Sequence, residues 1–268
     1  MLKEDLTKIY DAHTHFNDSS YEENGIAIKT IVEDAEKEGV GYFNDVAFDL
    51  DSSILAIEQA KQFDNVFATV GIHPTEIETL TNEVYDQLNI LAMDTKVVAI
   101  GEVGIDYFYT KETKEQQAIG FQKMIDLAIA RNKTLMMHIR DERNVYTAYD
   151  DAIAILSRNS IARKVVHCFS ANVDYAKKFL NLGCYIEIGG AVTFKNAKEL
   201  QEAVKVIPLE RMLVETDAPY LTPHPHRGEM NFSKNIVLTV EKIAELKNVS
   251  KEEVIAKTTE NAFNLFLK

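Results

Sequence analysis

The sequence contains no tryptophan and only two cysteines among its 268 residues. The cysteines, Cys168 and Cys184, lie in apolar, strand-like stretches rather than in a spaced framework, which excludes a fold stapled by disulfides. Because successive strand residues face opposite ways, we expect Cys168 to be a buried, inert thiol that points away from the neighbouring His167.

Long hydrophobic runs are also missing, and none approaches the roughly 20 residues that a membrane span requires. Residues 3–5 are charged and lead directly into the first predicted strand, so no targeting segment is visible. A composition of 46% hydrophobic and 26% charged residues is typical of a globular protein. We therefore expect a cytoplasmic protein that makes no membrane contact.

Positive charge is scarce, because 29 Lys and Arg stand against 42 Asp and Glu and give a formal net charge of −13. A protein that coats long duplex DNA normally carries a basic stripe, so any nucleic-acid contact must be local. Several cations follow predicted strand ends and would make that end of the fold basic: Lys111, Lys114, Arg140, Arg143, Lys195, Arg227 and Lys234. We interpret part of this set as ordinary solvated residues and favour Arg140 and Arg227 as substrate contacts.

The chain alternates apolar strands with amphipathic helices at a spacing of about 30 residues, as parallel α/β folds do. Eight strands are predicted, at about 8–14, 41–47, 66–71, 97–102, 134–139, 164–169, 184–188 and 212–217. Two helices, about 234–247 and 251–266, close the chain after the last strand. This pattern predicts a single domain over residues 1–268, a TIM (β/α)8 barrel with an additional C-terminal helix. A doubly wound open sheet is the alternative, but no Gly-x-Gly-x-x-Gly turn follows an early strand.

All seven histidines fall at or just after the ends of predicted strands or in a late loop: His13, His15, His73, His138, His167, His224 and His226. Strand ends of a barrel share one face, so we expect one common site there. Two carboxylates, Glu102 and Asp217, close the fourth and eighth strands. The alternative is that these residues only close strands, cap helices or pair with a nearby lysine.

Strand order suggests how such a site would bind metal. His13 and His15 point the same way on one strand and, with Asp217 on the neighbouring last strand, would hold one divalent ion. His138 and His167 would hold a second ion, and Glu102 would bridge the two. Imidazole suits Zn, Fe or Ni, whereas the carboxylates shift the preference towards Mg or Mn. The positive charge left over favours an anionic phosphodiester over an amide or a lactone.

Several motifs together resemble the TatD family of metal-dependent deoxyribonucleases, within the amidohydrolase superfamily. They run through essentially the whole chain: Asp11-x-His13-x-His15, Gly71-Ile72-His73-Pro74, Gly101-Glu102-Val103-Gly104-Ile105-Asp106, His138-x-Arg140, His167-Cys168-Phe169-Ser170, Glu215-Thr216-Asp217-Ala218-Pro219-Tyr220-Leu221 and Arg227-Gly228-x-x-Asn231. The resemblance implies a barrel enzyme that hydrolyses DNA phosphodiesters with Mg or Mn, chiefly as a 3′–5′ exonuclease on single-stranded ends.

The same resemblance implies roles for individual residues. The implied metal ligands are His13, His15, Glu102, His138, His167 and Asp217. Asp217 would also orient or deprotonate the attacking water, so that Asp217 and Glu102 are the catalytic candidates, while His73 and Arg227 would contact the substrate phosphate. One departure is that Asn231-Phe232-Ser233 lacks the proline that the family usually carries in this loop. We expect a less restrained loop, with Ser233 still able to cap the next helix.

An aromatic cluster, Tyr107-Phe108-Tyr109, follows Glu102. It would either anchor the loop by packing or stack on the bases of a single strand. In the second interpretation Tyr107 and Tyr109 join Arg140 as substrate-binding candidates.

Three other functions compete with DNA hydrolysis. A related amidohydrolase would cut an amide, lactone or phosphotriester, but many such enzymes carry a lysine near the end of strand four, and residues 99–102 contain none. An enzyme that deacylates aminoacyl-tRNA would use similar ions. A non-catalytic metal-binding scaffold would not need the full ligand set together with Arg227.

Overall fold

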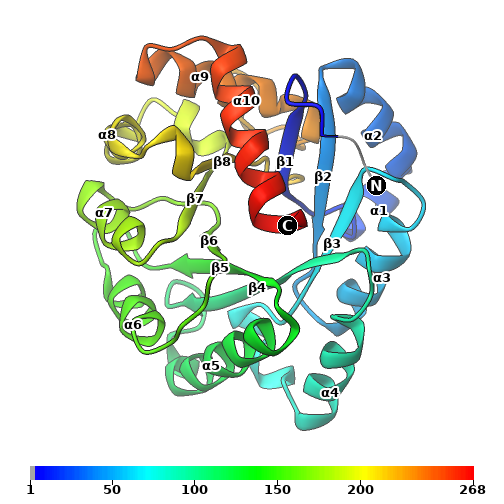
Figure 1. Cartoon of the computed structure of the whole chain (residues 1–268), viewed down its shortest axis with the longest axis vertical. Coiled ribbons are helices and arrows are strands. Elements are labelled where there is room, and N and C mark those ends of the chain that lie inside the picture. Colours follow the sequence, from blue (N-terminus) through cyan, green and yellow to red (C-terminus); the bar gives the residue numbers. More distant parts are fainter. Residues whose placement is uncertain (1–3) are drawn as a thin grey trace.

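The computed structural model describes residues 4–268 and contains one sheet of eight parallel strands. The strands pair in chain order from first to last, and Figure 1 shows them arranged as a ring with helices outside it. An isolated bridge between Thr14 and Ala218 brings the first and last strands together, so the barrel is nearly closed. The predicted TIM barrel is confirmed.

The strands are β1 Ile9–Thr14, β2 Val40–Val46, β3 Val66–Val70, β4 Val97–Asp106, β5 Thr134–Arg140, β6 Lys164–Val166, β7 Tyr185–Ile188 and β8 Met212–Val214. The helices are α1 Ser19–Glu23, α2 Ile28–Lys37, α3 Leu50–Ala60, α4 Asn82–Leu91, α5 Lys114–Arg131, α6 Thr147–Leu156, α7 Val173–Asn181, α8 Lys198–Val206, α9 Ile236–Lys247 and α10 Lys251–Ala262.

Strands β6 and β8 end about three residues earlier than the sequence predicts, at Val166 and Val214. Shortly after each end comes a residue with left-handed backbone, Cys168 with φ 45° and Asp217 with φ 55°. A left-handed residue cannot continue a strand, so the chain turns there and the side-chain alternation stops. These two turns determine how the site residues on β6 and β8 are presented.

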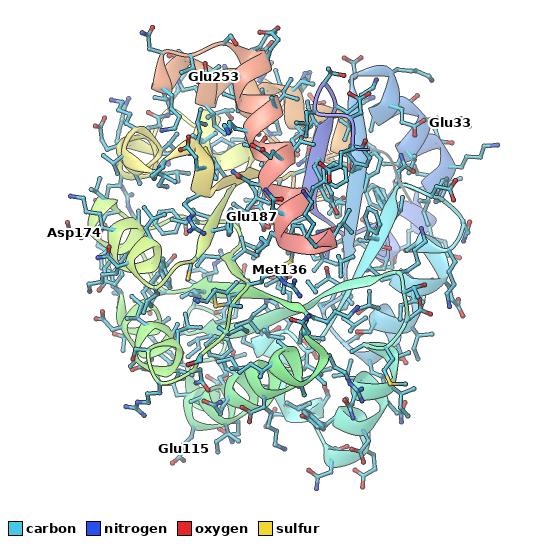
Figure 2. All side chains as sticks on the ribbon, in the orientation of Figure 1. Glu33, Glu115, Met136, Asp174, Glu187 and Glu253 are labelled. Carbon is cyan, nitrogen blue, oxygen red and sulfur yellow. The ribbon has the colours of Figure 1, made fainter. Side chains whose placement is uncertain are left out.

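The strands bury apolar side chains on both faces, as parallel strands covered by helices do. Figure 2 shows Met136 and Glu187 towards the middle of the ring, and both are completely buried. Glu33, Glu115 and Asp174 project outward from the outer helices.

Helix α10 and the residues after it cover the end of the barrel where the strands begin (Figure 1). Phe263 packs edge-on against Tyr10 at 5.9 Å between ring centres, and Phe266 stacks on the same ring. This end is therefore filled with aromatic side chains, and it leaves the opposite end, where the strands finish, for polar residues. In the part of the chain that the structure describes, no helix combines the length and the apolar character needed to cross a membrane.

Candidate metal centre

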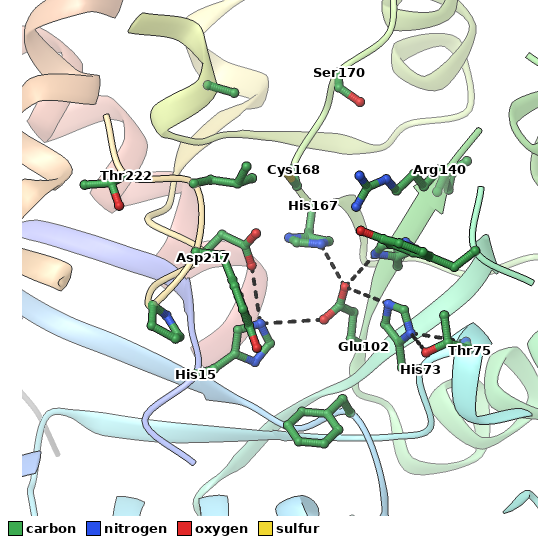
Figure 3. A pocket seen from close by; sticks show the side chains of 18 of the residues that line it. His15, His73, Thr75, Glu102, Arg140, His167, Cys168, Ser170, Asp217 and Thr222 are labelled. Atoms are coloured by element: carbon green, nitrogen blue, oxygen red, sulfur yellow. Dashed lines mark hydrogen bonds and ion pairs between the residues drawn. The ribbon is translucent and has the colours of Figure 1, made fainter. Parts of the chain in front are cut away.

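Five of the seven histidines meet where the strands finish. His13 and His15 come from β1 and the residue after it, His73 follows β3, His138 lies on β5 and His167 follows β6. Four of them line a cavity of about 850 Å³, whose interior is shown in Figure 3, and His13 is completely buried beside it.

The prediction of one site for all seven histidines was wrong for His224 and His226. Neither lines the cavity, and His226 lies 3.4 Å from Glu229 in an ion pair that is largely exposed to solvent. The reason is that these two residues follow no strand end but belong to the long loop after β8, which carries them out to the rim.

Glu102 lies at the centre of the cluster, with one oxygen facing each side (Figure 3). Its Oε2 atom is 3.5 Å from His13 Nε2 and 3.8 Å from His15 Nε2. Its Oε1 atom is 2.7 Å from His138 Nδ1 and 2.9 Å from His167 Nε2. Glu102 lies within strand β4, which continues to Asp106, at a point where the register with β5 shifts between Ile100 and Val103.

Asp217 joins the Oε2 side of Glu102. Its Oδ1 atom is 3.3 Å from His15 Nε2 and 3.7 Å from His13 Nε2. The left-handed turn after β8 and the hydrogen bond from the backbone N–H of Asp217 to the carbonyl of His13 fix this position. The structure thus groups His13, His15 and Asp217 on one side of Glu102, and His138 and His167 on the other.

The donor atoms fit divalent cations. Nε2 of His13 and Nε2 of His15 approach to 3.1 Å while both rings are buried. In the set His13, His15 and Glu102, and again in the set His73, Glu102 and His138, one donor atom per residue lies within 4.8 Å of the others. Buried imidazole and carboxylate donors crowded in this way are the ligands that Zn, Mn and related ions take. Whether one or two ions bind stays a prediction.

The electrostatics of the cluster favour ionised carboxylates. Burial raises the pKa of Glu102, but the surrounding imidazoles outweigh it, and its pKa lies well below the usual range. Burial also opposes ionisation of Asp217, yet hydrogen bonding to His15 and the charge of the histidines bring its pKa below the usual value. For His15, the attraction of Asp217 and Glu102 overcomes burial and raises the pKa to about 9.

His73 lies against the Oε1 side of the cluster, with Nε2 3.5 Å from Glu102. Its Nδ1 atom accepts the backbone N–H of Thr75 at 3.2 Å, which fixes the ring at the start of a short helical turn. Burial, followed by the positive charge of His138, lowers the pKa of His73 to about 3, so the ring is neutral. Its predicted contact with a substrate phosphate stays a prediction.

Two carboxylates without a predicted role contact His138 and His167, each at the ring nitrogen opposite the one that faces Glu102. Asp106 Oδ2 lies 2.9 Å from His138 Nε2, and Glu215 Oε2 lies 3.1 Å from His167 Nδ1. Both residues stand in the motifs Gly101–Asp106 and Glu215–Leu221, so the signal was present in the sequence. Carboxylates in this position orient a ligating imidazole and set which nitrogen carries the proton.

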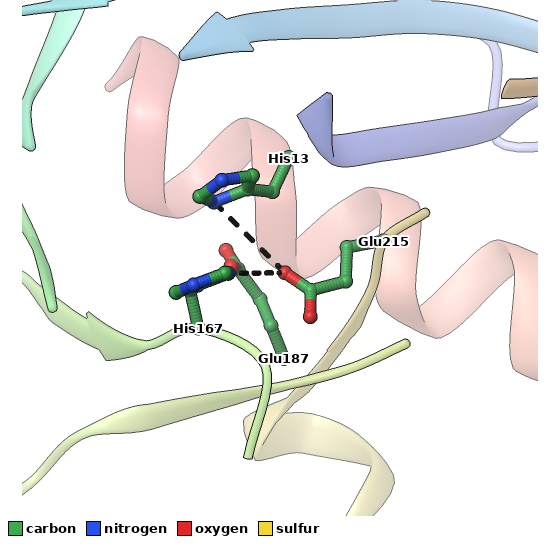
Figure 4. Close-up of side chains that lie close together, drawn as sticks. All are labelled: His13, His167, Glu187 and Glu215. Atoms are coloured by element: carbon green, nitrogen blue, oxygen red, sulfur yellow. Dashed lines mark hydrogen bonds and ion pairs between the residues drawn. The ribbon is translucent and has the colours of Figure 1, made fainter. Parts of the chain in front are cut away.

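A second buried group lies deeper in the barrel and contains His13, His167, Glu187 and Glu215 (Figure 4). Glu215 Oε2 is 4.0 Å from His13 Nδ1, and its Oε1 accepts the backbone N–H of Cys168 at 2.8 Å. Glu187 lies behind Glu215, and burial together with the negative charge of Glu215 raises its pKa well above the usual value. This shift favours the neutral form of Glu187.

The predicted substrate contacts separate into two groups. Arg140, Arg227 and Tyr109 line the cavity. Tyr107 does not: it is only 2% exposed, and its hydroxyl donates to Asp151 on α6 at 2.8 Å. The prediction that Tyr107 contacts substrate was wrong, because β4 extends to Asp106 and points the next side chain into the helix layer. The packing interpretation holds for Tyr107.

Arg140 and Arg227 are also the two cations of the predicted basic set that line the cavity. Lys111 instead pairs with Glu142, and Lys114 lies over the ring of Tyr107 at 4.0 Å. The remaining members of the set lie outside the lining: Arg143, Lys195 and Lys234.

Cys168 lines the cavity together with His167, so the prediction that it points away from His167 was wrong. Its left-handed backbone ends the strand alternation on which the prediction rested. Burial and the negative charge of Asp217 raise the thiol pKa well above its usual value, which agrees with an inert side chain.

The loop after β8 is held by Asn231, although the proline is missing. The Asn231 side chain donates to the carbonyls of Thr216 and Tyr220 at 3.0 and 2.7 Å and accepts the backbone N–H of Phe232 at 2.9 Å. Ser233 does not cap α9, contrary to expectation; its buried hydroxyl lies 3.4 Å from that of Thr14. The restraint on the loop therefore comes from side-chain hydrogen bonds.

Comparison with known proteins agrees with this geometry. Residues 10–267 match the family model described as TatD related DNase. The chain belongs to the TatD family. It is 36% identical to the uncharacterised metal-dependent hydrolase YabD of Bacillus subtilis over 96% of this chain and 98% of YabD. It is 37% identical to the uncharacterised metal-dependent hydrolase YcfH of Escherichia coli K12, over 96% of this chain and 95% of YcfH.

Among solved structures, the TatD homologue YjjV of Escherichia coli K12 superposes with a TM-score of 0.90. The two share 24% identity, and the alignment covers 98% of this chain and 100% of YjjV, so this likeness concerns the fold. Membership of the TatD family makes this chain a metal-dependent hydrolase. The geometry makes the histidine and carboxylate cluster its candidate active site.

Proposed function

We propose that this TatD-family hydrolase cleaves phosphodiester bonds of DNA, as a 3′–5′ exonuclease on single-stranded ends that uses two divalent ions, with Mg or Mn preferred. The observation that supports it most directly is the position of Glu102, whose two oxygens face two separate groups of imidazoles. A carboxylate placed in this way is suited to bridge two ions.

Charge selects the substrate class. When only the carboxylates that would contact the ions, Glu102 and Asp217, are counted, two divalent ions leave about two positive charges, which suits a phosphodiester because its transition state gathers negative charge. Arg140 and Arg227 add two cations to the cavity lining. Within residues 4–268 neither forms an ion pair with a carboxylate, so both remain available to phosphate oxygens. An uncharged amide or lactone would gain less from this surplus.

The residues divide the work as follows. Bound divalent ions supply Lewis acidity and make water a better nucleophile. His13, His15, Glu102, His138, His167 and Asp217 would hold them. Asp217, which reaches the cavity from the turn after β8, orients the attacking water and takes its proton. Arg140, Arg227 and the neutral His73 hold the phosphate in line for attack.

The overall negative charge fits single-stranded ends better than long duplex DNA. A net charge of −13 repels a phosphate backbone away from the site, whereas the cavity lining carries the cations Arg140 and Arg227. A strand end can enter a cavity of about 850 Å³, whereas a continuous duplex would have to lie across the acidic body.

Digestion of a 5′-labelled single-stranded oligonucleotide tests the proposal. The protein is supplied with Mg or Mn, beside a chelator-treated sample and the variants Glu102→Ala and Asp217→Asn. Glu33→Gln, on the outer face of α2, is the matched control. A ladder that shortens from the 3′ end, and disappears with chelator and in both site variants but not in the control, is the expected result.

An intact oligonucleotide in the presence of metal-loaded protein would rule out DNA as the substrate. An intact oligonucleotide could result from a protein without metal or from the wrong substrate, and metal content measured on the same samples separates these two causes. A protein that binds metal and leaves DNA intact acts on another ester or amide. Aminoacyl-tRNA esters would then be the first substrates to screen.

A further inference from the structure

Two aromatic side chains stand exposed at the rim of the cavity. Phe108 is 47% and Tyr109 is 61% exposed, in contrast to the buried Tyr107 beside them. Their rings meet edge to face with 4.7 Å between centres, and Tyr109 lines the cavity. An exposed aromatic pair beside a catalytic cavity offers a flat apolar surface to a ligand.

Arg140 packs on both rings. Its guanidinium carbon lies 4.5 Å from the ring centre of Phe108 and 4.7 Å from that of Tyr109. Arg140 is on β5 two residues after His138, so the two side chains project from the same face of the strand. Its unpaired charge therefore lies next to the metal ligands, with aromatic rings on its other side.

Phe108 and Tyr109 lie on a turn after β4, the aromatic turn, which is held in place by Asp106. The Asp106 Oδ1 atom accepts the backbone N–H groups of Phe108 and Tyr109 at 2.9 and 2.7 Å. Gln117 fixes Asp106 in turn, because its side chain accepts the Asp106 N–H at 2.8 Å and donates to the Asp106 carbonyl at 3.0 Å. The exposure of the two rings is thus a property of a well-restrained turn.

The same carboxylate also holds His138 through Oδ2. The aromatic rings and a predicted metal ligand are therefore tied to one residue, which fixes the distance between them. A phosphate held beside His138 would leave the adjoining nucleoside within reach of the Tyr109 ring.

We propose that Tyr109, supported by Phe108 and Arg140, is the stacking site for the nucleobase next to the scissile phosphodiester. This inference rests on the proposed function and adds a substrate preference to it. The enzyme recognises an unpaired base beside the bond that it cuts. Stacking on an aromatic ring accepts every base, so the preference is for the presence of a base and not for its identity. A base paired within a duplex would not offer its face.

Two single-stranded oligonucleotides that differ only at the 3′ end test this site. One carries normal nucleotides, and the other carries abasic tetrahydrofuran residues at its last positions, so that the phosphodiesters are kept and the bases are lost. We expect wild-type KM to be about tenfold higher for the abasic strand, the size of effect that loss of one base stack gives.

Three variants complete the experiment. Tyr109→Leu removes the aromatic face and keeps an apolar side chain. Tyr109→Phe keeps the aromatic ring and removes only the hydroxyl group. Tyr185→Leu is the matched control, because Tyr185 also packs against an arginine, Arg211 at 4.9 Å, but lies at the opposite end of the barrel at the start of β7. Circular dichroism checks that each variant folds.

The expected result is that Tyr109→Leu brings the KM values of the two substrates together, mainly by raising KM for the normal strand. Tyr109→Phe and Tyr185→Leu should keep the wild-type difference. Equal KM values for both strands in the wild type, or an undiminished difference in Tyr109→Leu, would overturn the stacking site while leaving DNA hydrolysis intact. A wild-type enzyme that cuts neither strand would instead overturn the proposed function, and this inference with it.

Discussion

Asp106 and Glu102 contact opposite nitrogens of one imidazole: Asp106 Oδ2 lies 2.9 Å from Nε2 of His138, and Glu102 Oε1 lies 2.7 Å from its Nδ1. A ring held at both nitrogens has one orientation. Asp106 also accepts the backbone N–H groups of Phe108 and Tyr109. The candidate metal centre and the aromatic residues at the rim of the cavity are therefore coupled through this single side chain.

Asp106→Ala should therefore impair two properties at once. The methyl group can neither contact His138 nor accept the N–H groups of Phe108 and Tyr109, so we expect metal affinity to fall by about 10-fold to 100-fold. We also expect a higher KM for single-stranded DNA, because the turn loses its anchor. Metal titration by calorimetry and steady-state kinetics measure the two effects. Asp34→Ala, at an exposed ion pair with Lys37, is the control, and unchanged metal affinity in Asp106→Ala would refute the coupling.

Glu215 and Glu187 are buried neighbours that should respond differently to the same substitution. Burial and the negative charge of Glu215 raise the pKa of Glu187 and favour its neutral form, so we expect Glu187→Gln to replace one uncharged group by another and to cost less than about 1 kcal/mol of stability. Glu215 accepts hydrogen bonds at both oxygens, from His167 and from Cys168, so Glu215→Gln should cost about 1–3 kcal/mol.

Urea unfolding of both variants, with metal content measured in parallel, provides the comparison. Weakened metal binding is expected in Glu215→Gln alone, since only Glu215 contacts a predicted ligand directly. Equal losses in the two variants would mean that Glu187 is ionised in the native state.

Asn231 should prove more important than the proline that the loop lacks. Asn231→Ala leaves two carbonyls, those of Thr216 and Tyr220, without their donors in a buried position, which should cost about 2–4 kcal/mol. We also expect weaker substrate binding, because the same loop carries Arg227. Thermal unfolding and KM are the measurements. Asn24→Ala, at an exposed helix end, should change stability by less than about 1 kcal/mol, and an equal effect of both variants would contradict the assignment.

The buried thiol of Cys184 should make the free energy of unfolding fall as pH rises into the alkaline range. Burial raises the pKa of its thiol from 9.0 to about 12. The unfolded chain therefore releases this proton first as pH rises, and the free energy of unfolding falls between these two values by up to about 1.4 kcal/mol per pH unit.

Cys184→Ala removes that contribution and leaves those of other groups in place. The difference in unfolding free energy between wild type and variant should thus shrink as pH rises from about 8 to about 11, measured in guanidinium with a reducing agent. A difference that stays constant over this range would show that the thiol is not shielded.

Much of the fold could be read from the sequence, because parallel strands covered on both faces appear as near-continuous apolar runs. All eight strands were predicted, and β4 was the one whose end extended furthest, to Asp106. The bounds of helix α7, between β6 and β7, were not predicted, although Asn172 caps it by accepting the backbone N–H groups of Asp174 and Tyr175. A short helix of this kind gains its stability mainly from packing, which a sequence window does not contain.

The candidate ligands could also be named from the sequence, since His13, His15, Glu102, His138, His167 and Asp217 all stand at strand ends or in family motifs. Their grouping around Glu102 follows from strand order alone. Chain order could not separate Tyr107 from Tyr109, because the two differ only in how the chain turns after β4.

The sequence by itself determined the barrel, the end at which the polar residues gather and the types of ligand available there. Only the tertiary structure decided which carboxylates stand behind the imidazoles, that Cys168 faces the cavity and that Arg140 packs on Phe108 and Tyr109. The physical reason is that apolar periodicity is a local property of the chain. Other features arise only when distant segments are brought together. They include the second contacts to a histidine, the left-handed turns at Cys168 and Asp217, and the stacking across two strands.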